Sequence, residues 1–192
     1  MKTIADIKIL SDIEIVDIIL TSKNSTAFGE LYDRYITNVY NKCLGFSKSS
    51  QEAEDLTQDV FIHAYTKLNT FTKKVSFRQW LYVLTYNFCV NYVNRDKNKK
   101  IEKASVEIND SNELLIDVDD YSLFQMQVDK LQKSLELINP EDKVILLLKY
   151  QDDLSIKDLS VLLTLSESAV KMRLKRAKSR LIESYNNIKT DE

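Results

Sequence analysis

"LSIKDLSVLLTLSESAVKMRLKRAKSRL", residues 154–181, decides the fold of the C-terminal part of the chain. Apolar residues recur at intervals of three and four on both sides of "TLS" (164–166), which is the spacing of two amphipathic helices. Ser155, with Asp158 three residues later, and Ser166 are typical helix N-caps. Two short helices joined by three residues predict a helix-turn-helix.

The second helix of this pair is strongly basic. Residues 165–181 hold six basic side chains and one acidic one, whereas the whole chain has a net charge of −2. If Val170 and Leu174 face the core, Lys171 and Lys175 lie on exposed turns. A solvated helix face could have the same composition. The helix-turn-helix context favours a recognition helix instead, in which the N-terminal half reaches base edges and the basic remainder neutralises phosphates.

The composition of the chain indicates its fold class and compartment. Its 192 residues include only two glycines and one proline, and so few helix breakers favour an all-α protein. The apolar runs are too short to span a bilayer, and the first residues lack the pattern of a signal peptide. The two cysteines are far apart in the sequence and form no metal motif. We therefore expect a cytoplasmic protein with no membrane insertion, cofactor or metal site.

Helical spacing also covers most of the N-terminal half. Capping boxes at 11–14 and 49–52 predict two helix starts, and an aromatic-rich segment over 77–100 predicts a long helix. After residue 100 acidic residues predominate and the helical stripe is lost, which predicts a linker. The predicted parts are an N-terminal helical domain, an acidic linker and a C-terminal helix-turn-helix domain: 1–100, 101–126 and 127–192.

The aromatic residues of the 77–100 helix suggest two different roles. Trp80 and Phe88 fit the apolar stripe of a core helix, whereas Tyr82 and Tyr86 fall off it. Exposed rings beside lysines can stack unpaired bases while the lysines hold the nucleic-acid backbone. The spacing therefore predicts that Trp80 and Phe88 are core residues and that Tyr82 and Tyr86 are exposed.

Four segments occur together in a fixed order: "AFGELYDRY" (27–35), "EAEDLTQDVFIHAY" (52–65), "FRQWLYVLTYNFCVNYVNR" (77–95) and the segment at 154–181. Together they resemble bacterial RNA polymerase sigma factors of the extracytoplasmic-function (ECF) group, within the sigma-70 family. The resemblance extends over about residues 11 to 185, apart from the linker. It implies that the chain binds core RNA polymerase and directs promoter-specific transcription initiation, by recognising −35 and −10 elements and helping to melt the promoter DNA.

The resemblance also implies three sets of site residues. The second helix of the pair would read the −35 element, and its implied contacts are Ser166, Ser168, Lys171, Met172, Lys175 and Arg176. The loop before residue 77 and the polar side of the following helix would meet the −10 element, and their implied contacts are Asn69, Phe71, Lys73, Lys74, Asn87, Asn91 and Arg95. The 49–68 helix would dock on the polymerase, and its implied contacts are Asp55, Leu56, Gln58 and Asp59. From the spacing alone, these acids are equally compatible with a solvated face.

The chain departs from the usual family pattern at positions that often hold glycine. Thr164 stands in the turn of the helix pair, Asp153 precedes "LS", and the loop at 69–77 contains no glycine. The first two departures predict some change in the turn geometry. The resemblance further implies an anti-sigma protein as a partner, and by analogy a linker that threads towards the active-site cleft of the polymerase.

Three other classes of protein explain the sequence less well. The single histidine, His63, has no nucleophile pattern near it, and the sequence has no P-loop, dinucleotide fingerprint or zinc spacing, so an enzyme is not expected. A transcription regulator acting without polymerase would account for the helix pair but not for the N-terminal segments. A protein-interaction module would account for the acidic faces but not for the basic helix.

Overall fold

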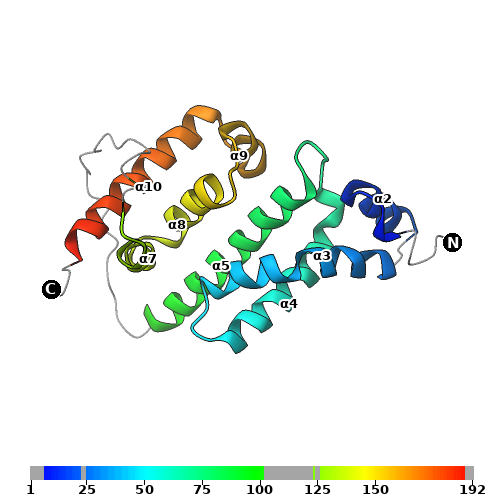
Figure 1. Cartoon of the computed structure of the whole chain (residues 1–192), viewed down its shortest axis with the longest axis horizontal. Helices are drawn as coiled ribbons and strands as arrows, with labels where there is room; N and C mark the ends of the chain where they lie inside the picture. The colour runs from blue at the N-terminus through cyan, green and yellow to red at the C-terminus, as the bar shows by residue number, and fades with distance from the viewer. Residues whose placement is uncertain (1–6, 23–24, 102–122, 124–125, 189–192) are drawn as a thin grey trace. The chain divides into compact units, whose positions relative to one another are not determined.

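The computed structural model describes residues 7–22, 25–101, 123 and 126–188, which form helices and their connections (Figure 1). No strand occurs within these ranges, and the predicted all-α fold class is confirmed. The chain divides into two compact units, residues 1–93 and 94–192. The acidic linker predicted at 101–126 lies almost entirely outside the described residues.

The first unit is a helical bundle that runs from blue to green in Figure 1. Its elements are α2 (Asp12–Ser22), α3 (Ser25–Leu44), α4 (Ser50–Lys67), the 3-10 turn η1 (Leu68–Thr70) and α5 (Phe77–Ile101) up to Val93, since the last residues of α5 fall beyond the limit of the unit. The predicted long helix over 77–100 thus ends within one residue of its expected limit. Every helix contributes to one apolar core, whose members include Ile15, Leu31, Val39, Leu56, Val60 and Leu81.

Helices α3 and α4 run antiparallel, as their aromatic contacts show. The ring of Phe28, near the start of α3, lies 4.9 Å from that of Tyr65 near the end of α4. One turn further along α3, the ring of Tyr32 lies 4.6 Å from that of Phe61. These edge contacts contribute about 0.5–1.5 kcal/mol each beyond the burial of apolar area.

Helix α5 runs parallel to α3 and packs along its length. The rings of Tyr35 and Phe77 lie 5.6 Å apart at the start of the contact. Further along both helices, the thiol of Cys89 lies 3.9 Å from that of Cys43. Because α5 packs on α3 and also touches α4 through the His63–Phe88 pair, it buries more of its surface than a single apolar stripe.

The predicted capping boxes of the first unit are present in different degrees. Glu14 accepts hydrogen bonds from the backbone N–H and the hydroxyl of Ser11, which caps α2. At the start of α4, the hydroxyl of Ser49 accepts from the Glu52 N–H, as expected. The Glu52 carboxylate accepts from the N–H of Lys48 instead of Ser49. This second bond is therefore shifted by one residue, and the helix start is unchanged.

The helices of the second unit are coloured from yellow-green to red in Figure 1. Its elements are α7 (Val128–Leu137), α8 (Pro140–Leu146), the π-helical turn η2 (Leu147–Gln151), α9 (Ile156–Leu163) and α10 (Glu167–Asn187). Pro140 occupies the first turn of α8, where its missing N–H costs no helical hydrogen bond. Val128, at the first residue of α7, is 76% exposed.

Candidate nucleic-acid interface

The turn between α9 and α10 has the predicted three residues, 164–166, and the conformation of a helix C-cap. Thr164 adopts the left-handed region, with φ 57° and ψ 40°, and its N–H donates to the carbonyl of Ser160. The N–H of Leu165 donates to the same carbonyl at 3.1 Å, and the Ser160 hydroxyl donates back to the Leu165 carbonyl at 2.7 Å. This arrangement satisfies backbone groups that a helix end leaves without partners. The helix-turn-helix therefore forms although threonine replaces the usual glycine.

The start of α10 is capped as predicted. The hydroxyl of Ser166 accepts from the N–H of Ala169 at 3.2 Å and lies 3.0 Å from the hydroxyl of Ser168. The core side of α10 carries Val170 and Leu174, which are buried. The capped end of a helix presents backbone N–H groups and a partial positive charge, both of which suit a phosphate.

The opposite face of α10 carries most of the predicted −35 residues. Lys171 and Arg176 are exposed, and Met172 lies between them with 45% of its surface accessible. Ser166 and Ser168 are exposed at the start of the same helix. Lys175 is half-buried, so only part of its side chain reaches solvent. The structure thus brings five of the six predicted residues to the surface of one helix end.

The loop between η1 and α5 divides the −10 candidates into exposed and buried residues. Asn69 and Lys74 are exposed. Phe71 is only 5% exposed, and its ring lies 5.8 Å from Phe77 and 5.7 Å from Trp80. The Phe71 ring therefore anchors the loop to the core in this structure, and its contact with a −10 base stays a prediction.

Lys73 is also engaged within the protein. Its backbone is left-handed, with φ 61°. Its ammonium group lies 2.5 Å from a carboxylate oxygen of Asp17 on α2. The side chain retains 42% of its surface, so the ion pair is open to solvent.

The polar side of α5 is exposed where the sequence placed it. Asn87, Asn91 and Arg95 are spaced by four residues and are exposed, so they form one row along the helix. Amide and guanidinium groups in such a row can donate to phosphates or to base edges. These three predicted residues therefore share one accessible face.

The tyrosines of α5 are not exposed, and this prediction is wrong. Tyr82 is 7% and Tyr86 is 1% exposed. The ammonium of Lys42, from α3, lies 4.0 Å from the centre of the Tyr82 ring and donates to the Tyr86 hydroxyl at 3.1 Å. Both rings therefore hold a buried cation of the same unit through cation–π contacts and cannot stack on bases in this conformation.

The acidic face of α4 has the exposure expected of a docking surface, with one exception. Asp55, Gln58 and Asp59 are exposed, whereas Leu56 is only 3% exposed. Leu56 thus packs in the core behind these polar side chains, and its part in docking stays a prediction. Ile62, which the sequence analysis missed, is 63% exposed. Its spacing of three and four residues from Asp59 and Gln58 was the available signal.

In the described part of the chain, no group of three or more histidine, cysteine or acidic residues could hold a metal ion. Cys43 and Cys89 are free and buried, and the hydrogen bond from Cys89, helped by Thr57, lowers the pKa of the Cys43 thiol despite burial. None of the described helices is both long and apolar enough to cross a bilayer.

Comparisons with known families match both units. The model of sigma-70 region 2 matches residues 31–99, and the model of sigma-70 region 4 matches residues 129–181. Together they span more than half of the chain and contain all of the candidate site residues. The first match contains α4, the loop and most of α5, and the second contains α9 and most of α10.

Individual relatives and solved structures agree with these matches. The chain is 28% identical over 173 residues to the ECF RNA polymerase sigma factor SigM of Bacillus subtilis, with 85% of this chain and 98% of SigM covered. It is 24% identical over 169 residues to SigW of the same organism, with 84% and 90% covered. In fold it is similar to the sigma factor RpoE of Bartonella quintana, solved with the anti-sigma factor NepR, at a TM-score of 0.56 and 18% identity, covering 84% and 98%. CnrH, solved with the cytosolic domain of CnrY, gives a TM-score of 0.60 at 18% identity, covering 93% and 99%. The chain therefore belongs to the ECF group of the sigma-70 family and is a sigma factor of transcription initiation.

Proposed function

We propose that this sigma factor reads the −35 element through α10 and the −10 element through the loop before α5 and the polar row of α5, while α4 docks on core RNA polymerase. The observation that carries the proposal is the exposed face of α10. Lys171 and Arg176 are accessible there, while Val170 and Leu174 fix the opposite face in the core. A helix held in this way can enter a major groove without disturbing its own packing.

The −35 contacts divide by chemistry. Lys171 and Arg176 can donate to guanine O6 and N7, and a good bidentate contact of this kind discriminates against a wrong base by about 1–3 kcal/mol. Ser166 and Ser168, at the capped start of α10, suit phosphate oxygens and would set the register of the helix on DNA. Met172 lies between the two cations and offers an apolar contact to a thymine methyl group.

The −10 contacts come from the segment between α4 and α5 and from α5 itself. Asn69 in η1 and Lys74 in the loop are exposed, and Asn87, Asn91 and Arg95 form the exposed row of α5. Removing a base from the stack costs a few kcal/mol, which contacts in the loop must offset. In this proposal Phe71 supports the loop from below, and contributes to base capture by holding its shape.

Docking on the polymerase would use the exposed side of α4. Asp55, Gln58 and Asp59 supply polar contacts, and Ile62 supplies an apolar one. An exposed aliphatic side chain beside carboxylates is typical of an interface that combines an apolar centre with a polar rim. Leu56 contributes only by keeping α4 in place.

We propose that the partners of the chain are core RNA polymerase, promoter DNA and an anti-sigma protein. The third partner is inferred because the RpoE structure of similar fold was solved with the anti-sigma factor NepR. As a promoter-specificity subunit the chain would act in the cytoplasm and would not itself catalyse a reaction. We propose the same domain limits as before: an N-terminal domain at 1–100, a linker at 101–126 and a C-terminal helix-turn-helix domain at 127–192.

The docking part of the proposal is tested with core polymerase. The double change Asp55→Ala and Asp59→Ala should weaken core binding, measured by fluorescence anisotropy of labelled sigma factor. The matched control, Asp129→Ala with Glu136→Ala, removes two exposed carboxylates from α7 of the other unit. Equal binding by the two double variants would contradict the docking assignment.

The −35 part is tested by run-off transcription with reconstituted holoenzyme. The double change Lys171→Ala and Arg176→Ala should leave core binding intact and lower the preference for the best −35 sequence by roughly tenfold or more. The control, Lys67→Ala with Lys133→Ala, removes two exposed lysines outside α10. An unchanged −35 preference would contradict the assignment of α10. A wild-type chain that neither binds core polymerase nor directs specific initiation would overturn the proposed function as a whole.

A further inference from the structure

We propose that Asp17 on α2 is a positioning residue for the loop between η1 and α5, and that α2 thereby tunes the base preference at the −10 element. The Asp17 carboxylate lies 2.5 Å from the ammonium of Lys73, across 56 residues of sequence. The inference rests on the proposed role of this loop in −10 recognition. The inference adds α2 to the elements that affect −10 recognition, although α2 contributes no residue to the proposed DNA contacts.

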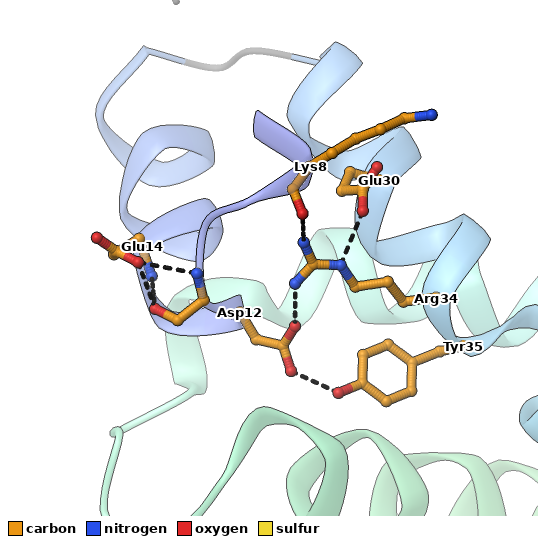
Figure 2. A network of polar contacts seen from close by, with 7 residues as sticks. Lys8, Asp12, Glu14, Glu30, Arg34 and Tyr35 are labelled. Atoms are coloured by element: carbon orange, nitrogen blue, oxygen red, sulfur yellow. Dashed lines mark hydrogen bonds and ion pairs between the residues drawn. The ribbon is translucent and has the colours of Figure 1, made fainter. Parts of the chain in front are cut away.

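Helix α2 is rigidly placed, which is what a positioning element requires. Its Asp12 accepts a hydrogen bond from Arg34 Nη1 at 2.8 Å and another from the Tyr35 hydroxyl, both on α3 (Figure 2). Arg34 also donates to Glu30 at 2.8 Å and to the carbonyl of Lys8 at 2.9 Å. Charge-assisted bonds of this kind are stronger than neutral ones and fix geometry.

The apolar side of α2 reinforces this placement. Ile15 and Val16 are completely buried, and Ile19 is only 4% exposed. These side chains pack into the core of the first unit. Asp17 is therefore carried by a helix that is anchored by packing on one side and by the Asp12–Arg34 network at its first turn.

The loop is held at its two ends by packing and by a helix cap, and between them by an ion pair at Lys73. Phe71 is packed on Phe77 and Trp80. At the other end, the Ser76 hydroxyl accepts from the Gln79 N–H at 3.2 Å and caps the start of α5. Between them Lys73 takes a left-handed conformation, with φ 61°, which non-glycine residues rarely adopt. Its contact with Asp17 is the ion pair that ties this middle part to α2.

The size of the effect follows from the exposure of the pair. The side chains of Lys73 and Asp17 retain 42% and 50% of their surface. An exposed ion pair shifts an equilibrium by at most about fivefold, so it contributes little to global stability. If the loop exchanges between two conformations, the same fivefold factor changes the ratio of their populations. The ion pair is therefore too weak to add much to the stability of the unit, but it is strong enough to favour one loop conformation.

The Asp17 carboxylate competes with DNA phosphates for the Lys73 ammonium. In this structure the Lys73 ammonium is paired with the Asp17 carboxylate, and both Lys73 and Lys74 are exposed. Replacing Asp17 by asparagine would release Lys73 towards DNA phosphates, which bind without regard to sequence. We therefore expect Asp17→Asn to reduce base discrimination at the −10 element without reducing DNA affinity.

The test is holoenzyme transcription from a library of promoters with randomised −10 bases, in which each promoter is linked to a barcode downstream of the start site and the barcodes are read by sequencing of the transcripts. Asp17→Asn should lower the preference for the best base by about two- to fivefold, the range of an exposed ion pair. Asp17→Glu, which keeps the charge, should retain the wild-type preference. The matched control, Asp33→Asn, makes the same charge change at an exposed site on α3 and should have no effect.

The outcomes separate this inference from the proposed function. If wild type selects −10 bases and Asp17→Asn gives the same profile, the positioning role is refuted while the proposed function stands. If Asp17→Asn lowers transcription from all promoters equally, the residue is merely structural, and the inference is again refuted. A wild-type chain that selects no −10 sequence refutes the proposed function and the inference with it. Thermal unfolding of Asp17→Asn should remain close to that of the wild type, since both partners are exposed.

Discussion

Replacing Thr164 by glycine should stabilise the helix-turn-helix. Thr164 is exposed and left-handed at the C-terminal end of α9, with φ 57° and ψ 40°. The left-handed region costs a residue with a β-carbon about 1–2 kcal/mol, and a β-branched residue is an outlier there. Glycine avoids this cost, but it loses about 0.5–1 kcal/mol more conformational entropy on folding. The net gain expected for Thr164→Gly is therefore about 0.5–1 kcal/mol.

The assay must report on the second unit alone, because a chain of two units need not unfold in one step. Hydrogen exchange at the buried part of α10, around Val170 and Leu174, meets this condition. A gain of about 0.5–1 kcal/mol slows exchange through global opening of the unit by about two- to fivefold. Amides in α4, in the first unit, should exchange as in the wild type.

Two further variants separate backbone strain from side-chain effects. Thr164→Ala removes the hydroxyl and the branching but keeps a β-carbon, so it should gain much less than the glycine variant. Thr66→Gly makes the same chemical change on an exposed position of the right-handed helix α4, where glycine is unfavourable, and it should destabilise the first unit. The reasoning is refuted if Thr164→Gly exchanges no more slowly than the wild type, or if Thr164→Ala slows exchange equally.

Three other changes have defined outcomes. Burial, and after it the hydrogen bond to a carboxylate on α2, raises the pKa of the Tyr35 hydroxyl. Folding therefore favours the neutral form of Tyr35. The resulting contribution to the free energy of unfolding is present in full below about pH 10, the ordinary pKa of tyrosine, and is lost as the pH rises further. Alkaline urea titrations should therefore show a smaller loss for Tyr35→Phe than for the wild type. Asp142 is 6% exposed at its side chain and bonds Arg180 at 2.8 Å, so Asp142→Asn should cost about 2 kcal/mol, seen as faster exchange in α10. Leu56→Ala should cost about 3 kcal/mol in unfolding followed by the single tryptophan, whereas Asp55→Ala should change stability by less than about 0.5 kcal/mol.

Local features of the fold were predictable because they are determined by residues that are close together in the sequence. The caps at Ser11, Ser155 and Ser166, and the helix start at Pro140, depend on residues within one turn of each other. The order of the helices and the basic face of α10 follow from apolar spacing within single segments. These features required no knowledge of which helices pack together.

The errors and omissions arose where one helix meets another. Tyr82 and Tyr86 fall off the narrow apolar stripe of α5, but Lys42 of α3 covers them. Phe71 lies in a non-periodic loop, and its burial depends on α5 folding back against it. The pair of Asp17 and Lys73 joins residues far apart in sequence. Spacing along a single segment carries no signal for any of these contacts.

The non-glycine residues with positive φ in the described ranges are Lys73, Asp153 and Thr164. All three lie in segments where the sequence lacks a glycine that the family resemblance led us to expect. The backbone is nevertheless left-handed at each position, and hydrogen bonds or an ion pair accompany this conformation. At Thr164 these contacts are the bonds to the Ser160 carbonyl. After Asp153 the Leu154 N–H donates to the carbonyl of Leu148 at 3.0 Å. At Lys73 the same left-handed conformation is accompanied by the ion pair with Asp17. A glycine at this position would have no side chain to form that ion pair and hold the loop.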